Sequence, residues 1–176
     1  MAWGAAEDEQ TQVGPLLTAA RVERVASLVA RAKAEAFTVL QPHLNAPAPA
    51  APIPKGATYF PPTIVLCDHS DAEIVQEETF GPVLVVQRAR DWDQAMMLLN
   101  DVRQGLAAAC FTDDAATQQR FLAEARAGIL KINRATADAG VDVPFGGWKT
   151  SGFGTPQHGQ ANVEFYTRYQ TIYSAE

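Results

Sequence analysis

Short apolar runs alternate with longer amphipathic segments through most of this 176-residue chain, and this alternation constrains its fold more than any other feature. The runs are rich in valine, isoleucine, leucine or alanine, as buried strands are. They cover residues 63–66, 83–86, 106–111 and 129–132. Strands that alternate with helices form parallel sheets with helices on their faces. The sequence therefore predicts an α/β fold with a parallel sheet and flanking helices.

Cap residues and apolar spacing predict where the helices lie. Thr18 can cap a helix that runs to about Ala36 and has one apolar face: Val22, Val25, Leu28, Val29 and Ala32. A helix from Asp91 is expected to turn four residues to the core: Trp92, Ala95, Met96 and Leu99. Another, from about Asp114, is expected to bury Phe121, Leu122 and Ala125 and to end at Gly128. Ser70 and Glu73 have capping-box spacing, which predicts a short helical turn that starts at Ser70.

Four further segments complete the predicted organisation. Residues 38–40 could form a short strand, and residues 42–55 form a loop rich in proline and alanine. Proline lacks an amide hydrogen and fixes φ, so this loop should be an exposed surface insertion. A glycine-rich loop follows Asn133 and runs to about Gly159, and a loop of this length in a compact domain is usually functional or disordered. Residues 165–173 alternate well enough for a strand.

Composition excludes several classes of function. The net charge is −6 and the basic residues are scattered, whereas a nucleic-acid-binding protein needs a clustered basic face. No apolar run approaches the roughly 20 residues of a membrane span. The first eight residues have neither the basic nor the apolar region of a signal peptide. Two cysteines form no disulfide framework, which favours a cytoplasmic location.

The usual metal and phosphate motifs are missing from the sequence. His43, His69 and His158 are far apart and have no ligand spacing, so no metal site is expected. A Cys67–His69 catalytic pair is disfavoured, because residues two apart in a strand share a face but rarely bring sulfur to imidazole. Trp148 separates Gly147 from Lys149, so the segment is not a phosphate loop. No G-x-G-x-x-G dinucleotide motif occurs.

Two phrases resemble signatures of the NAD(P)-dependent aldehyde dehydrogenase superfamily. Residues 77–82 read Glu-Glu-Thr-Phe-Gly-Pro, similar to E-E-x-F-G-P, and residues 144–154 are similar to P-F-G-G-x-K-x-S-G-x-G. Shorter matches, among them Gly14-Pro15 and Asn133, follow in family order. By this resemblance the chain corresponds to the last third of a full-length member. Residues 1–160 then belong to a partial catalytic domain, and residues 161–176 form an oligomerisation strand or tail.

The resemblance implies roles for three residues. Glu78 matches the glutamate that holds the nicotinamide ribose hydroxyls, and a carboxylate can accept hydrogen bonds from both. Phe80 matches the aromatic residue that touches the nicotinamide ring, and Phe145 matches a residue near the aldehyde pocket. The implied cofactor is NAD or NADP. Pro156-Gln157 stand where the family commonly has arginine and glutamate, so the substrate class cannot be transferred directly.

The resemblance also implies what this chain lacks. The family's nucleophilic cysteine lies in a G-Q-x-C setting, upstream with the general-base glutamate and the dinucleotide-binding domain, and neither Cys67 nor Cys110 fits that setting. No catalytic residue is therefore expected, and both cysteines are expected to be structural. Three hypotheses stay open: a truncated aldehyde dehydrogenase, inactive alone; a non-catalytic module that associates with itself or with a full-length relative; and, least favoured, an independent cysteine enzyme. A dimer or larger species is expected in each case.

Overall fold

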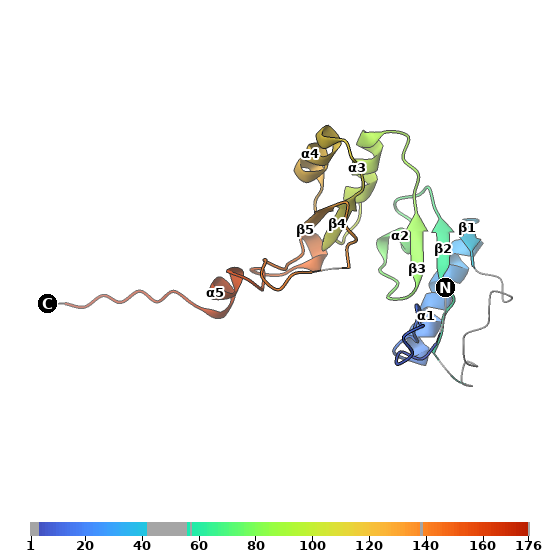
Figure 1. Cartoon of the computed structure of the whole chain (residues 1–176), viewed down its shortest axis with the longest axis horizontal. Coiled ribbons are helices and arrows are strands. Elements are labelled where there is room, and N and C mark those ends of the chain that lie inside the picture. Colours follow the sequence, from blue (N-terminus) through green and yellow to red (C-terminus); the bar gives the residue numbers. More distant parts are fainter. Residues whose placement is uncertain (1–3, 42–55, 57, 138, 176) are drawn as a thin grey trace. The chain divides into compact units, whose positions relative to one another are not determined.

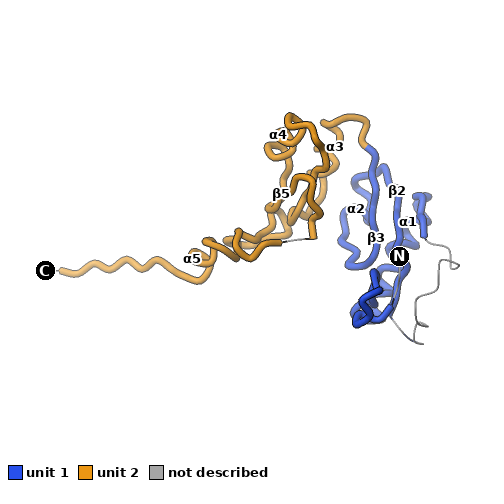
Figure 2. The backbone as a smooth tube through the Cα atoms, in the orientation of Figure 1, with its two compact units in different colours: residues 1–88 blue, residues 89–176 orange. Residues whose placement is uncertain are grey.

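The computed structural model describes residues 4–41, 56, 58–137 and 139–175. The chain divides into two compact units, residues 1–88 and 89–176, and Figure 2 colours them separately. The predicted loop at residues 42–55 lies outside the described residues. Among the described helices, none has the length and apolar character needed to cross a membrane.

The first unit is a three-stranded sheet with helices packed against it (Figure 1). Its elements are α1 (Ala19–Ala34), β1 (Thr38–Leu40), β2 (Thr63–Leu66), α2 (Glu73–Gln76) and β3 (Val83–Val86). Strand β2 lies in the middle, antiparallel to β1 and parallel to β3. Thr18 caps α1 as predicted, because its side chain accepts a hydrogen bond from the Arg21 amide. The predicted strands at 38–40, 63–66 and 83–86 are therefore confirmed.

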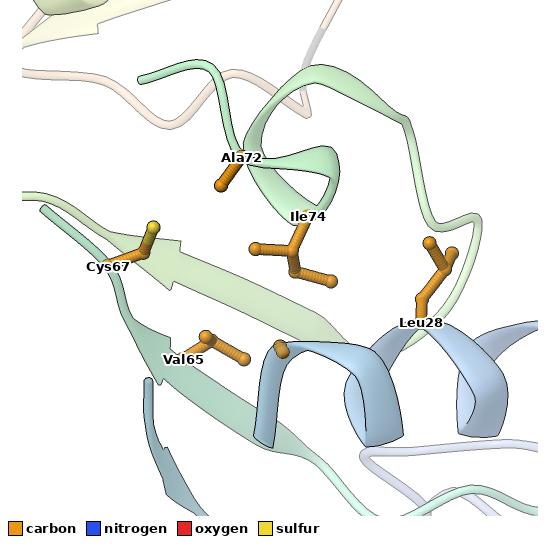
Figure 3. Close-up of a cluster of buried hydrophobic side chains, with 6 residues drawn as sticks. Leu28, Val65, Cys67, Ala72 and Ile74 are labelled. Carbon is orange, nitrogen blue, oxygen red and sulfur yellow. The ribbon is translucent and has the colours of Figure 1, made fainter. Parts of the chain in front are cut away.

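The core of the first unit lies between α1, α2 and one face of the sheet. The buried residues of α1 are the predicted apolar ones, Val25, Leu28, Val29 and Ala32. Leu28 of α1, Val65 of β2, Cys67 just after β2 and Ile74 of α2 form one buried cluster. Figure 3 shows Ile74 between Leu28 and the side chains of Val65 and Cys67. The opposite sheet face stays open, because Leu40, Ile64 and Leu84 pair across the three strands and are 51%, 39% and 58% exposed.

The second unit has two parallel strands and two helices that cover one of their faces. The elements are α3 (Trp92–Asn100), β4 (Ala107–Cys110), α4 (Ala115–Glu124), β5 (Ile129–Ile132), a short 3-10 turn (Lys149–Ser151) and α5 (Ala161–Tyr166). Asp91 and Asp114 cap α3 and α4 as predicted, with side chains that accept from backbone amides three residues on. The core groups Met96, Phe121 and Ala125 with the apolar side chains of both strands. The predicted parallel α/β character holds in both units.

Two helix-end predictions are wrong. Helix α2 begins at Glu73 with Ala72 in the cap position, so the helical turn does not start at Ser70 as predicted. The Ser70 carbonyl instead accepts a hydrogen bond from the Gln76 side chain. Helix α4 ends at Glu124, because Ala125 is already extended, and Gly128 lies beyond it. Leu122, predicted to be buried, is 45% exposed, since it faces away from the Phe121 side of the helix.

The C-terminal tail also differs from its prediction. Phe165 and Tyr166 lie in α5 rather than in a strand, and residues 167–175 form neither helix nor strand. A strand satisfies its amides and carbonyls through a neighbouring strand. None of the described strands pairs with this segment. A strand formed together with another chain stays a prediction.

Candidate functional site

The Glu77–Pro82 turn joins α2 to β3 and displays its two candidate cofactor residues outward. Glu78 is exposed and the Phe80 side chain is 62% exposed. Phe80 has a φ of 51°, which is unusual for a residue other than glycine. Such backbone strain persists where surrounding structure fixes it, often at a functional site. The turn therefore holds the Phe80 ring in an exposed position against its local backbone preference.

Helix α1 fixes this turn through three contacts. The Arg24 guanidinium donates a hydrogen bond to the Glu78 carbonyl at 3.5 Å. The Arg21 guanidinium lies 5.7 Å from the centre of the Phe80 ring, within cation–π range. A Cβ atom on Gly81 would come within 2.6 Å of a Val25 methyl group, so glycine permits the close approach of turn to helix. Sequence reasoning missed Arg21 and Arg24, although their three-residue spacing on one helix face was a signal.

The exposed side chains of this turn fit the groups of a nicotinamide nucleoside. Within the described residues, the Glu78 carboxylate makes no hydrogen bond or ion pair. Arg24 donates to the backbone carbonyl of Glu78 and not to its carboxylate. The carboxylate can thus accept from two vicinal hydroxyls. The Phe80 ring offers an apolar surface beside it. Both residues predicted for cofactor binding therefore share one turn of the first unit, while Phe145 belongs to the second unit.

In the second unit, the 144–154 segment is fixed to the end of α3. The Lys149 ammonium donates to the carbonyls of Asn100 and Val102 at 2.8 and 2.9 Å. A helix C-terminus carries partial negative charge, so a lysine there is favourable. Thr150 donates from its amide and its hydroxyl to the Arg103 carbonyl, at 3.1 and 2.7 Å. The Ser151 hydroxyl accepts a hydrogen bond from the Gly105 amide at 3.0 Å. The lysine and serine of the signature, with Thr150 between them, therefore have a structural role that sequence reasoning did not assign.

Glycine is required where this segment passes close to its neighbours. A Cβ atom on Gly128, just before β5, would lie 1.9 Å from the Gly146 carbonyl oxygen. A Cβ atom on Gly152 would lie 1.9 Å from the Gly147 carbonyl oxygen. No flexible side chain could move aside at either contact, because the obstructing atoms belong to the backbone. Gly128 therefore permits the Phe145 segment to pass close to the start of β5, and Gly152 permits a close approach within the segment itself.

Phe145 pairs with Gln157 in a small antiparallel bridge. The two backbone hydrogen bonds between them measure 2.7 and 2.9 Å. The His158 ring lies 5.5 Å from the Phe145 ring. The backbone of His158 has a φ of 71°. The Nδ1 atom of its side chain is buried and has no hydrogen-bond partner among the described residues. Phe145 also lines a hollow of about 450 Å³ between β5 and the loop that follows it. His158 is thus a neighbour of Phe145 that the sequence order did not reveal.

The two cysteines do not resemble activated nucleophiles. Cys67 is 1% exposed and its thiol donates to the His69 carbonyl at 3.3 Å. Burial raises the pKa of the Cys67 thiol, which opposes the thiolate that a nucleophile needs. Cys110 is half-buried and packs on the Met96 and Phe121 core. The His69 ring lies 5.8 Å from the Phe37 ring in a tilted arrangement, and the Cys67 thiol bonds to the His69 backbone carbonyl rather than to the ring.

Other features of the described residues suggest no alternative centre. No group of three histidine, cysteine, aspartate or glutamate side chains in the described part of the chain could hold a metal ion. Another hollow, of about 1040 Å³, lies at the ends of α3 and α4 and includes Met97, Leu122 and Trp148. It contains none of the three residues that the sequence singled out.

Comparison with known proteins agrees with these motifs. The sequence profile described as "Aldehyde dehydrogenase family" matches residues 1–172. The 4-trimethylaminobutyraldehyde dehydrogenase of Rattus norvegicus is 36% identical over 167 residues, which is 93% of this chain and 33% of that protein. The aldehyde dehydrogenase [NAD(P)+] 1 of Saccharomyces cerevisiae is 35% identical over 94% of this chain and 32% of its own length.

Solved structures give the same result. Betaine aldehyde dehydrogenase from Staphylococcus aureus in complex with NAD+ has a TM-score of 0.81 at 30% identity, over 94% of this chain and 32% of that one. The Mycobacterium tuberculosis aldehyde dehydrogenase complexed with NAD+ has a TM-score of 0.82 at 26% identity, over 96% of this chain and 33% of that one. The chain spans about a third of the length of these relatives. It belongs to the aldehyde dehydrogenase family.

Proposed function

We propose that this chain supplies the nicotinamide-facing turn and part of the aldehyde pocket of an NAD(P)-dependent aldehyde dehydrogenase, and that it has no turnover by itself. The observation that carries the proposal is the Glu77–Pro82 turn, which α1 holds so that Glu78 and Phe80 face outward. Glu78 would hold the ribose hydroxyls, Phe80 would contact the nicotinamide ring, and Phe145 would line the aldehyde pocket. NAD or NADP, when bound, supplies the hydride acceptor.

The buried state of Cys67 supports the absence of turnover. Aldehyde oxidation through a thioester needs a thiolate that can reach the carbonyl. A buried thiol with a raised pKa cannot supply one, and Cys110 packs in a core. The open sheet face formed by Leu40, Ile64 and Leu84 supports completion by further polypeptide, because a row of exposed apolar side chains marks an interaction surface. We also propose a cytoplasmic location, consistent with two free cysteines.

A chimera tests the cofactor role. This chain is fused behind the first two thirds of the Staphylococcus aureus relative, and binding of NAD+ and aldehyde oxidation are measured. Replacing the carboxylate by Glu78→Gln should weaken NAD+ binding about tenfold, the usual effect of one charge-assisted hydrogen bond. Glu23→Gln, on the exposed side of α1, is the matched control. A folded chimera that binds NAD+ equally well with Glu78→Gln would contradict the assignment.

A second function is favoured by the tail, namely a module that associates with itself or with a full-length relative. Tyr169, Ile172 and Tyr173 are 103%, 79% and 93% exposed, in a segment without secondary structure. Exposed apolar side chains of this kind mark interaction surfaces. Light scattering should show a dimer or larger species that becomes smaller when residues 167–176 are removed. A full chain that stays monomeric at high concentration would argue against this function.

A further inference from the structure

We propose that the hollow beside Phe145 binds the tail of an aldehyde that carries a carboxylate at its far end. This inference rests on the proposed function, because it treats Phe145 as part of the aldehyde pocket. The family relationship leaves the charge of the tail open. The residues that line the hollow all belong to the second unit, and their chemistry indicates which charge the tail carries.

Strand β5 directs Lys131 into this hollow. Leu130 and Ile132 pack on the helix-covered core, so the alternating residues Ile129 and Lys131 point to the opposite face of the sheet. The residues beside them on β4 are Ala107 and Ala109, whose small side chains leave room there. The loop that follows β5 lies over this face and contributes Val143, Pro144 and Phe145 to the lining. Lys131 therefore stands on the floor of a hollow with an apolar wall.

The charges of the hollow favour an anion. Its described lining includes the ammonium group of Lys131 and no carboxylate side chain. Lys131 donates one long hydrogen bond, 3.5 Å, to the Thr136 carbonyl. An ammonium group has three donors, so Lys131 retains capacity for a ligand carboxylate. Val143, Pro144 and Phe145 offer contact for an alkyl chain, as the apolar walls of ligand pockets do.

The same residues disfavour a cationic tail. A trimethylammonium group is bound by several aromatic rings that surround it. Phe145 is the single aromatic residue in the described lining of the hollow, and Lys131 would repel a cation. A volume of about 450 Å³ is sufficient for a short aliphatic chain with a charged end. The residues of the hollow therefore favour aldehydes that end in a carboxylate.

Nuclear magnetic resonance on the isotope-labelled whole chain tests this inference. Three probes of similar length are titrated separately: butyrate, butan-1-ol and trimethylpropylammonium. Butyrate should shift the amide signals of residues 129–132 and 143–145 at the lowest concentration, and trimethylpropylammonium should not. Lys131→Gln should weaken butyrate binding about tenfold. Lys33→Gln, a lysine change in the first unit, should leave it unchanged.

Three results would overturn the inference. They are equal or tighter binding of trimethylpropylammonium, butyrate binding that Lys131→Gln does not weaken, and the absence of any shift at these residues. A native spectrum of the Lys131→Gln chain outside residues 129–145 verifies that the variant is folded. The chimera with Glu78→Gln is measured independently, so a failure here is distinguishable from a failure of the proposed cofactor role.

Discussion

Individual residues in this chain are fixed by neighbours that are distant in sequence. Phe80 has a positive φ, and the Arg21 guanidinium lies over its ring. Lys149 also has a positive φ, and its ammonium group donates to two carbonyls at the end of α3. The resemblance identified Glu78 and Phe80 as candidates, but it could not reveal Arg21 and Arg24. Their role depends on the packing of α1 against the turn, which local sequence does not encode.

An ion pair between α1 and α2 leads to a prediction about pH. Arg31 forms two hydrogen bonds with Glu73, at 2.6 and 3.0 Å, and they lower the pKa of the Glu73 carboxyl. Because the pKa is lowered in the folded state, the stabilisation is complete above the unfolded pKa and is lost as pH falls through the folded one. Both side chains are about half exposed, so the effect is small.

Urea unfolding of Glu73→Gln measures this contribution. The variant should be slightly less stable than the parent chain at pH 7, and the difference should become smaller as the pH falls to 3. Glu23→Gln, on the exposed side of α1, should match the parent chain at both values. A difference that is the same at pH 7 and pH 3 would show that the pair contributes nothing through ionisation.

At the scale of elements, the strands and most helix starts could be predicted from the sequence. The strands at 63–66, 83–86 and 129–132 have the predicted bounds, because short β-branched runs between helical segments have few alternatives. Thr18, Asp91 and Asp114 cap their helices as predicted, since capping needs only a local side-chain oxygen. Helix ends were harder to predict: α4 stops before Gly128, because tertiary packing decides where the chain turns toward β5.

The attachment of the 144–154 segment to α3 predicts a stability effect. Lys149→Met removes two charge-assisted hydrogen bonds to backbone carbonyls. The second unit should lose about 1–2 kcal/mol of unfolding free energy, and Lys149→Arg should recover part of it. Amide exchange at Gly105, which is bonded to Ser151, should accelerate in Lys149→Met. Unchanged stability and exchange would show that the segment is held without this lysine.

For the molecule as a whole, the family could be predicted from two phrases of sequence and the α/β class from the alternation of strands and helices, but several consequences could not. The tail strand was expected from alternation, yet residues 167–175 have no secondary structure because a strand requires a partner. The open row of Leu40, Ile64 and Leu84 also emerged only from the strand register. The chain spans about a third of the length of its relatives. Both features are expected if it functions within a larger assembly.

We propose that this chain presents cofactor-facing and substrate-facing residues without a nucleophile. The most direct test is an NAD(P)+ reduction assay on the purified chain with a panel of aldehydes, alongside a Cys67→Ser/Cys110→Ser variant. We predict no turnover above the rate without protein, for the parent chain and the variant alike. Turnover by the parent chain that disappears in the variant would identify a cysteine of this chain as the nucleophile and would contradict the account.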